Sequence, residues 1–561
     1  MSAVPGATMG EVLRFHAGRR PDKPAFETLD GRSLSFGQLN RRVNRLCAAL
    51  HQWGLRKGDR VAVLSRNRPE YMEAFGVSKA GYIVVPLNWR LAEQELLKLL
   101  AHSAPEVLIV DEAYLDLVDG LRAQLPGLRH FVSLGARRDG WVSYEALVGE
   151  RSGEALAGDT DYVADALAQE PETEATTGDV LCLVYTSGTT GAPKGVMLTH
   201  RGLMDNCRAS AVDSLVLTED DYAVAVMPMF HVGGMWYHLF PCFASGATTL
   251  LLPEFDPGVL LRELAARKAT NVHVVPTMLN AMLNHPLAQS VDLSHLRLMF
   301  YAASSMPAEL LRRAMQCFRQ CGFVQGYGST EAGMVTALSP ADHVRASQPG
   351  GEQLLSSCGR ALPGREVRIS EESGAVLPHG RIGEIESHSP GAMAGYWHDA
   401  AATARVLREG WLKTGDLGHM DAEGYVYLVD RKNDMVVTGG ENVYPTEVEA
   451  FFYEDPDVLE AAVFGVPDPQ WVERVVAAVV LRPGVTLDER ELIQRLRARL
   501  AGYKCPKNIF FTDDLPKSGA GKVLRKDLRK QYGGAAAGAG DMPQAATAGG
   551  GRKAMEPGSK P

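Results

Sequence analysis

A run of glycine, hydroxyl-bearing and small residues that leads to a lysine is the part of this sequence best suited to chemistry. Residues 186–195 are TSGTTGAPKG, and they follow an apolar run at 180–185 that predicts a buried strand. Glycines let the backbone approach phosphate oxygens, N–H and hydroxyl groups donate to them, and lysine adds a positive charge. The loop is not a Walker A loop, because Pro193 precedes the lysine and Gly195 follows it. The pattern favours a phosphate-binding loop over an ordinary turn.

Four later segments also place small or polar residues after apolar runs. They are 227–234 (MPMFHVGG), 301–307 (YAASSMP), 325–331 (QGYGSTE) and 411–416 (WLKTGD). Small residues after a strand let a flat ligand lie against the backbone. A fifth segment, 516–525 (PKSGAGKVLR), has two glycines that predict a mobile loop presenting Lys522.

In this order the segments resemble the motifs of the adenylate-forming superfamily, which includes acyl-CoA synthetases, luciferases and peptide-synthetase adenylation domains. The resemblance extends from about Met9 to Tyr532. It implies an ATP-dependent carboxylic acid–CoA ligase: the carboxylate attacks ATP to give acyl-AMP and pyrophosphate, and CoA then gives acyl-CoA and AMP. Because two anions meet in the first step, the site must supply positive charge and a metal ion. The implied cofactor is Mg²⁺, with ATP and CoA as co-substrates.

The resemblance also implies roles for individual residues. Lys522 stabilises charge on the α-phosphate and the carboxylate, Thr330 donates to the α-phosphate, and Glu331 holds Mg²⁺ together with Thr190. His231 closes one wall of the acyl pocket near the carboxylate and completes the catalytic set. The residues implied to bind ATP or AMP are Thr186, Ser187, Gly188, Thr189, Thr190, Gly191, Lys194, Ala302, Ala303, Ser304, Tyr327, Gly328, Thr330, Asp416 and Arg431.

Three further sets follow from the resemblance: an acyl pocket (Phe230, His231, Val232, Gly233 and Trp236), a CoA site (Gly439, Gly440, Glu441, Trp471 and Lys507) and a hinge (Asn433). The pocket stretch is apolar and aromatic, and residues 222–253 contain no Asp, Glu, Lys or Arg. The expected substrate is therefore a monocarboxylic acid with an apolar body. Both a medium- or long-chain fatty acid and an aryl acid, such as a cinnamate or a benzoate, fit this description.

Other activities remain as alternatives. An acyl-AMP ligase that serves a non-CoA acceptor shares the first step, and two departures from the usual CoA-site residues, Val472 and Cys505, keep it open. An amino-acid adenylation domain would need an acidic residue for the α-ammonium group, and residues 222–253 contain none. Nothing in the sequence favours a luciferase-like oxygenase. Lys522 and Glu331 argue against a catalytically silent binding protein.

Composition bounds the class of protein. The chain has 561 residues, 45% of them hydrophobic and 22% charged, and its net charge of −9 argues against nucleic-acid binding. Its eight scattered cysteines indicate free thiols and no zinc site. Prolines and glycines within 222–253 predict a strand, a loop and a buried helix, not a membrane span. We see no signal peptide or organelle address and expect a cytoplasmic protein, monomeric or homodimeric.

Strands alternate with helices along the chain, which predicts an α/β fold with parallel sheets. We expect an N-terminal AMP-binding domain at 1–430, made of layered α/β subdomains and a β-rich subdomain from about 360. A small, mobile α+β domain with the catalytic lysine should follow at 431–532. The Ala/Gly-rich tail, 533–561, is expected to be disordered.

Overall fold

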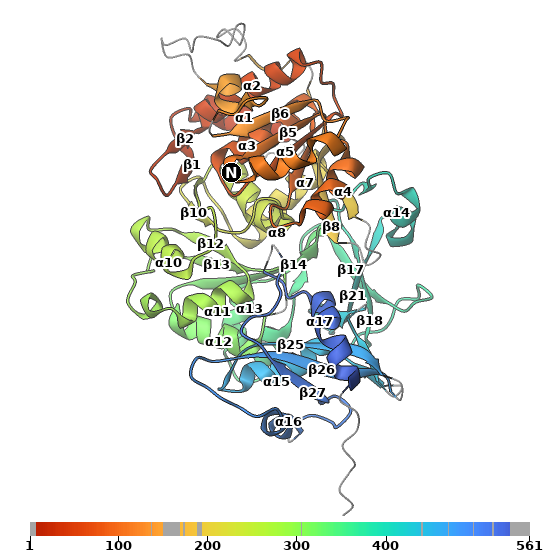
Figure 1. The fold of residues 1–561 in the computed structure, drawn as a ribbon. Coiled ribbons are helices and arrows are strands. Elements are labelled where there is room, and N and C mark those ends of the chain that lie inside the picture. Colours follow the sequence, from red (N-terminus) through yellow and green to blue (C-terminus); the bar gives the residue numbers. More distant parts are fainter. Residues whose placement is uncertain are drawn as a thin grey trace, which may run out of the picture.

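The computed structural model describes residues 7–135, 137–149, 169–171, 174–187, 193–304, 306–432, 434–438, 441–468, 471–497, 499–518 and 521–538. These residues form four sheets and the helices that cover them (Figure 1). Two large sheets and an antiparallel sheet make up the larger, N-terminal part, and the fourth sheet belongs to the smaller C-terminal part drawn in blue. The expected α/β fold class is confirmed.

The sheet that leads into the phosphate loop has eight strands in the order β19-β9-β8-β4-β3-β5-β6-β7. Its strands from β8 to β7 run parallel, and β9 returns antiparallel to β8. A parallel sheet covered on both faces needs continuous apolar strands, and these strands are mostly buried. Their bounds are β3 (Arg60–Leu64), β4 (Ile83–Leu87), β5 (Val107–Asp111), β6 (His130–Leu134), β7 (Val142–Ser143), β8 (Val180–Ser187), β9 (Pro193–Thr199) and β19 (Gly395–Tyr396).

The second sheet has nine strands in the order β16-β15-β14-β13-β12-β10-β11-β1-β2. The neighbours from β14 to β1 run parallel, so their carboxyl ends meet at one edge, where ligands bind in open α/β sheets. The bounds are β1 (Pro24–Thr28), β2 (Ser33–Ser35), β10 (Tyr222–Ala225), β11 (Thr248–Leu251), β12 (Asn271–Val274), β13 (Leu298–Tyr301), β14 (Gly322–Ser329), β15 (Gly333–Leu338) and β16 (Arg360–Ala361).

Helices separate these strands and cover the sheets. The longest described helix of the N-terminal part, α2, begins with a capping box in which Ser35 and Gln38 satisfy each other's backbone N–H groups. The helices of this part are α1 (Met9–Arg19), α2 (Phe36–Gln52), α3 (Pro69–Gly76), α4 (Glu93–Ser103), α5 (Leu115–Leu121), α6 (Tyr144–Val148), α7 (His200–Arg208), α10 (Pro257–Ala266), α11 (Pro276–Asn284), α12 (Ala308–Cys317), α13 (Pro340–Ala346) and α14 (Ala400–Val406).

The uncharged stretch 222–253 is broken up, as its prolines and glycines predict. Between β10 and β11 lie a short helix α8 (Val232–Gly234), a π-helical turn η6 (Met235–Leu239) and helix α9 (Phe240–Ser245). Trp236, Phe240 and Phe243 are fully buried there. Among the described residues, no helix has the length and apolar character needed to cross a membrane.

The antiparallel sheet confirms the short strands expected from about residue 360. It contains β17 (Glu366–Ser370), β18 (Gly383–His388), β20 (Leu407–Arg408), β21 (Trp411–Met420) and β22 (Val426–Arg431). Strand β22 pairs with β21, and this pairing places Arg431 opposite Asp416. The register thus joins two residues that the sequence predicts for the nucleotide site.

The C-terminal part has its own sheet and two cores of its own. Helices α15 and α17 pack against its long strand β25. The change from one sheet to the next falls between Arg431 and Val436, close to the predicted boundary, although the domain limits themselves stay predictions. The elements are β23 (Val436–Thr438), β24 (Glu441–Val443), α15 (Pro445–Glu454), β25 (Val458–Asp468), β26 (Val472–Leu481), α16 (Glu489–Arg497), β27 (Asn508–Phe511) and α17 (Arg525–Gly538).

The start of the expected tail needs a correction. Helix α17 continues to Gly538, whereas the disordered tail was expected to begin at residue 533. The extra residues, 533–538, include three alanines, the residue with the highest helix propensity, and they extend a helix that is already formed. Residues 539–561 lie outside the described residues.

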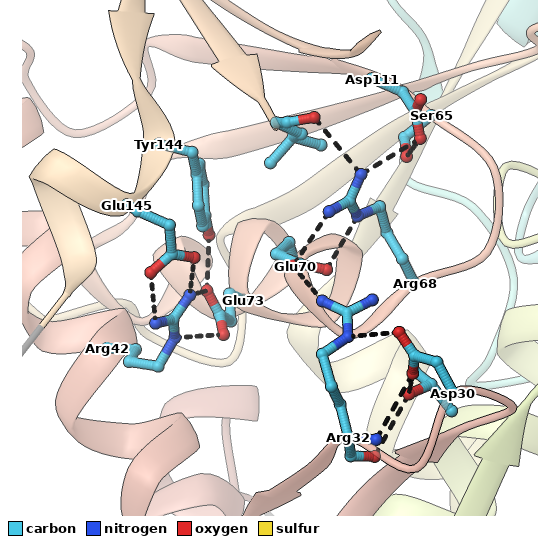
Figure 2. A network of polar contacts seen from close by, with 12 residues as sticks. Asp30, Arg32, Arg42, Ser65, Arg68, Glu70, Glu73, Asp111, Tyr144 and Glu145 are labelled. Carbon is cyan, nitrogen blue, oxygen red and sulfur yellow. Dashed lines mark hydrogen bonds and ion pairs between the residues drawn. The ribbon is translucent and has the colours of Figure 1, made fainter. Parts of the chain in front are cut away.

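A network of ion pairs, centred on the buried Glu73, links α2, α3 and α6 (Figure 2). Arg42 Nε lies 2.7 Å from Glu73 Oε1, and its Nη2 lies 2.7 Å from Glu145 Oε1. The hydroxyl of Tyr144 donates to Glu73 at 2.8 Å. Burial raises the pKa of Glu73, so its carboxylate depends on Arg42 and Tyr144 for stabilisation.

Removing Glu73 should therefore destabilise the N-terminal part. Glu73→Ala leaves Arg42 with one partner, and we expect the free energy of unfolding to fall by about 3 kcal/mol. In the matched variant Glu145→Ala, the lost carboxylate is 61% exposed, so we expect a change of less than about 1 kcal/mol. Urea denaturation followed by tryptophan fluorescence measures both. Equal effects of the two variants would contradict this account of the network.

Candidate active site

The phosphate loop is framed by two antiparallel strands. Thr186 and Ser187 end β8, and β9 begins at Pro193, so that Lys194 pairs with Thr186 across the ladder. Lys194 Nζ lies 5.0 Å from the centre of the Tyr396 ring, a cation–π contact. The predicted residues at the tip of the loop, Gly188, Thr189, Thr190 and Gly191, lie outside the described residues.

Glu331 lies close to this loop although it follows a different sheet. It stands in the turn between β14 and β15, and the hydroxyl of Tyr396 donates to its Oε1 at 3.1 Å. Since Lys194 sits over the same tyrosine ring, the structure brings Lys194 and Glu331 to one place. Thr330, next to Glu331, is 8% exposed. A cation and a carboxylate at the mouth of a glycine-rich loop suit a polyphosphate and its counter-ion.

Gly328 is required by a close approach of two backbones. The register of β14 and β15 shifts between Tyr327 and Gly328. A Cβ atom at Gly328 would lie 1.9 Å from the carbonyl oxygen of Gly333, so only glycine fits there. This bulge sets the direction in which Thr330 and Glu331 leave the strand.

Three residues of the predicted nucleotide site, Tyr327, Asp416 and Arg431, form one hydrogen-bonded group. The Tyr327 hydroxyl donates to Asp416 Oδ2 at 2.9 Å, and Arg431 Nε lies 3.3 Å from Asp416 Oδ1. Asp416 is 5% exposed, while the Arg431 side chain is 54% exposed. A buried carboxylate held by two donors keeps its remaining lone pairs in a fixed direction.

The small residues after β13 include a strained backbone. Ala303 has φ +73°, a left-handed conformation that costs a non-glycine residue on the order of 1–2 kcal/mol. Ala302 before it is buried, and Ser304 after it is half-buried. Such strain is typical of ligand-binding loops, and this segment is among those predicted to bind the nucleotide.

His231 forms the N-cap of α8 and is held in one tautomer. Its Nδ1 accepts a hydrogen bond from the backbone N–H of Gly233 at 3.0 Å, which leaves the proton on Nε2. Burial, and then the charge of Lys522, lowers the pKa of His231 to about 4. The ring is therefore neutral at physiological pH.

The other predicted pocket residues are buried apolar side chains on the same segment as His231. Val232 and Trp236 are 3% and 1% exposed, and they share the large core of the N-terminal part. Phe230 is 7% exposed and meets the ring of Trp89 edge to face, with centroids 6.4 Å apart. The pocket region is thus apolar and packed.

Lys522 belongs to the C-terminal part of the chain, but its loop lies against residues of the N-terminal part. Its loop is closed by a hydrogen bond from Ser518 N to Lys522 O at 2.6 Å. A Cβ built at Gly521 would lie 3.1 Å from Val275 and 3.2 Å from Thr277, at the start of α11. The loop therefore rests on the carboxyl edge of the nine-stranded sheet.

The charge of Lys522 is perturbed by this position. Burial, and then repulsion by Arg431, lowers the pKa of Lys522 to about 8, while Asp416 acts in the opposite direction. Lys522 also contributes to the low pKa of His231. The structure thus brings Lys522 together with predicted residues of the acyl pocket and the nucleotide site.

The described residues of the predicted CoA site lie in or next to strands of the C-terminal sheet. Glu441 is exposed on β24, and Lys507 Nζ donates to Gly502 O at 3.3 Å just before β27. Trp471 is 44% exposed, and it precedes Val472, which has φ +72°. Within the described ranges, no hydrogen bond or ion pair links Glu441, Trp471 or Lys507 to the residues around Lys522. Gly439, Gly440 and the hinge residue Asn433 are not among the described residues.

Two residues of the site were missed in the sequence. Tyr396 bonds Glu331 and packs under Lys194, yet its only local signal is an aromatic pair between Gly395 and His398. Asp434 pairs with Arg525 and Arg529 and helps to keep Lys522 charged. Neither lies in a segment whose composition indicates chemistry.

Comparison with known proteins agrees with this geometry. A family model described as AMP-binding enzyme matches residues 13–397, and the AMP-binding enzyme C-terminal domain matches residues 447–522. The chain therefore belongs to the AMP-binding enzyme family. The two matches together span more than half of the chain, and they include residues of both the N-terminal and the C-terminal part.

Relatives cover nearly the whole chain. An indoleacetate–CoA ligase from Aromatoleum aromaticum is 38% identical over 524 residues, which are 93% of this chain and 98% of the relative. A feruloyl-CoA synthase from Amycolatopsis is 39% identical over 504 residues, 90% of this chain and 95% of the relative. Among solved structures, an anthranilate CoA ligase in complex with anthranoyl-AMP superposes with a TM-score of 0.84 at 29% identity, covering 96% of this chain and all of that one.

Proposed function

We propose that this protein is an AMP-forming carboxylic acid–CoA ligase whose substrate is an aryl acid or another acid with an apolar body. The carboxylate attacks the α-phosphorus of ATP, giving acyl-AMP and pyrophosphate, and the CoA thiol then displaces AMP to give acyl-CoA. The observation that carries the proposal is the position of the half-buried Lys522, whose loop rests on Val275 and Thr277 and whose charge is coupled to His231 and Asp416 of the other part of the chain. A cation between an apolar pocket and a ribose-type carboxylate suits the meeting of a carboxylate with ATP.

Each residue of the site has a separate role in this reaction. Lys194, with Thr186 and Ser187, holds the phosphates at the loop, and Thr330 donates to the α-phosphate. Asp416 accepts from the ribose hydroxyls and Arg431 steadies it, while Tyr327 and the segment 302–304 flank the adenine. His231, which is neutral, orients the carboxylate through its Nε2–H without changing the charge of the site. Lys522 stabilises the negative charge that builds up as the two anions meet.

The donors present fit a magnesium ion. The described residues contain no group of three or more His, Cys, Asp or Glu side chains that could hold a metal alone. Mg²⁺ commonly needs only one or two carboxylates, because phosphate oxygens and waters complete its shell. Glu331 is the carboxylate next to the phosphate loop, and Thr190 is proposed as its second protein ligand. The ion would offset the charge of the polyphosphate.

The substrate class rests on the pocket and on the relatives. The side chains of Phe230, Val232 and Trp236 are apolar and buried, and the stretch 222–253 has no charged residue for a second carboxylate. Relatives named for indoleacetate and ferulate are 38% and 39% identical. A long-chain-fatty-acid–CoA ligase from Bacillus subtilis is 34% identical, so fatty acids remain in the substrate range to be tested.

Transfer to CoA requires the C-terminal part to move. The Lys522 loop lies against Val275 and Thr277, whereas Glu441 lies on β24, and Trp471 and Lys507 lie just before β26 and β27. Rotation of this part about the segment that contains Asn433 would withdraw Lys522 and bring the CoA residues to the acyl-adenylate.

A substrate panel tests the proposal. Pyrophosphate release would be measured with ATP and Mg²⁺ for aryl acids, fatty acids of several lengths and amino acids, each with and without CoA. We expect CoA-dependent turnover with aryl or other apolar monocarboxylic acids. Adenylate formation that ignores CoA would replace the proposal by an acyl-AMP ligase, and silence with every acid would reject it.

Lys522 should matter for one half-reaction only. We expect Lys522→Ala to slow adenylate formation by at least about a hundredfold, while transfer from preformed acyl-AMP to CoA changes by less than about threefold. The control is Lys517→Ala, because Lys517 lies in the same loop but pairs with Glu460 and Asp514. Equal loss in both half-reactions would refute the assigned role.

The pH profile should report the same group. Because the pKa of Lys522 is lowered to about 8, the reactive ammonium is lost as pH rises through that value, and kcat/KM for ATP in pyrophosphate release without CoA should fall up to about tenfold per pH unit above it. Lys522→Arg keeps its charge, so its slower profile should stay flat from pH 7 to 9.5. A wild-type profile that is also flat would contradict the prediction.

A further inference from the structure

One buried histidine near the acyl pocket is poorly satisfied by hydrogen bonds. His273, on β12, is 1% exposed, and neither of its ring nitrogens has a described partner at ordinary hydrogen-bond distance and angle, although the backbone of Gly233 approaches the ring. Its neighbour His238 is also buried, but His238 Nε2 lies 2.7 Å from Asn271 Oδ1. A buried polar group without a partner is rare in a folded protein and is costly unless a ligand or water supplies the missing bond.

The ring of His273 points to the side of the sheet that α8 and η6 cover. In the register of the sheet His273 lies beside Phe300, and their ring centroids are 4.7 Å apart. The ring of His238, on η6, is 6.0 Å away. Phe300 packs in the same core as Trp236 of the predicted acyl pocket. His273 is therefore a polar group in an otherwise apolar wall.

His273 lies near two elements of the proposed carboxylate site. Val275, two residues further along the chain, is the residue against which Gly521 of the Lys522 loop lies. His231, which caps α8, is close enough to influence His273 electrostatically. His273 therefore lies near His231 and on the strand whose carboxyl end meets the Lys522 loop.

The protonation state of His273 decides what it can bind. Its pKa is lowered well below the ordinary value by burial and then by His238 and His231, while the nearby backbone of Gly233 acts in the opposite direction. These are the groups that face it from η6 and α8. A neutral imidazole offers one N–H donor and one acceptor, and it has no charge with which to attract a carboxylate.

We propose that His273 determines specificity by hydrogen-bonding an uncharged polar group on the apolar body of the acid, such as a ring hydroxyl or a ring N–H. This inference rests on the proposed function, because it assumes that the acid occupies the space between His231 and the sheet. It narrows the substrate to aryl acids that carry a hydrogen-bonding group remote from the carboxylate. A site built to bond such a group discriminates strongly against analogues that lack it.

Matched pairs of acids test the proposal. The pairs are 4-hydroxycinnamate with cinnamate and indole-3-acetate with 1-naphthaleneacetate, and the measurement is kcat/KM for CoA-dependent pyrophosphate release. In the wild type we expect the polar member of at least one pair to be preferred by about tenfold or more. His273→Leu should reduce that preference at least about fivefold while the apolar member keeps its rate within about threefold. His273→Gln, which can donate and accept, should retain part of the preference.

The matched control is His343→Leu. His343 is also buried, but its ring is bonded to the Tyr301 hydroxyl at 2.9 Å and to Ser339 O at 2.7 Å, and Tyr301 packs in a different core from Phe300. This variant should lower stability and leave the preference between matched acids unchanged. The control therefore distinguishes the effect of removing any buried histidine from the effect of removing a contact between His273 and the substrate.

Two results would overturn the inference. One is a wild-type enzyme that turns over both members of every pair within about threefold of each other. The other is a His273→Leu variant in which both members lose activity in parallel. If His273→Leu does not fold, the wild-type preference and the His273→Gln variant still decide. Absence of CoA-dependent turnover with any acid in the panel would instead reject the proposed function.

Discussion

The burial of one ammonium group is the constraint on which the site depends. Lys522 gives up much of its hydration where its loop rests on Val275 and Thr277, and its pKa of about 8 reflects that cost. Arg431 adds to the cost, and Asp416 only partly offsets it. The ligand-free site is therefore short of negative charge at the place where ATP and a carboxylate are proposed to meet. Binding of these anions would restore the full charge of Lys522 when it is needed.

The same position requires that the contact between the two parts can be broken. The hydrogen bonds that join them away from the hinge include Asn280 Nδ2 to Leu459 O at 3.4 Å and Arg482 Nη1 to Asn284 Oδ1 at 3.5 Å. Both are long. Inside the C-terminal part, by contrast, Arg525 Nη2 donates to both carboxylate oxygens of the half-buried Glu449, at 2.7 and 2.8 Å. Weak contacts between rigid parts allow rotation without unfolding.

Short sequence patterns predicted the secondary structure where neighbouring residues determine it. Apolar runs gave the parallel strands, and glycines and prolines broke up 222–253 as expected. Tyr396 was missed because its role depends on Glu331, 65 positions away in the chain. The neutrality of His231 also could not be predicted, because it follows from burial and from a lysine of the other part of the chain. The extension of α17 to Gly538 was missed because the Ala/Gly-rich composition of 533–538 is typical of a disordered tail. These residues follow directly on a helix, and the alanines continue it.

Neutral histidines explain why an apolar pocket can be selective without being charged. A second carboxylate on the substrate would need a cation opposite it, and the histidines of this region have pKa values too low to provide one: about 4 for His231 and for His238, and well below the ordinary value for His273. Protonating any of them would require charging a fully desolvated ring. An uncharged hydroxyl or N–H group needs no such change, because a neutral imidazole already offers a donor and an acceptor. If the proposed function holds, these rings provide no cation for a second carboxylate, whereas they can form a hydrogen bond with an uncharged polar group of an aryl acid.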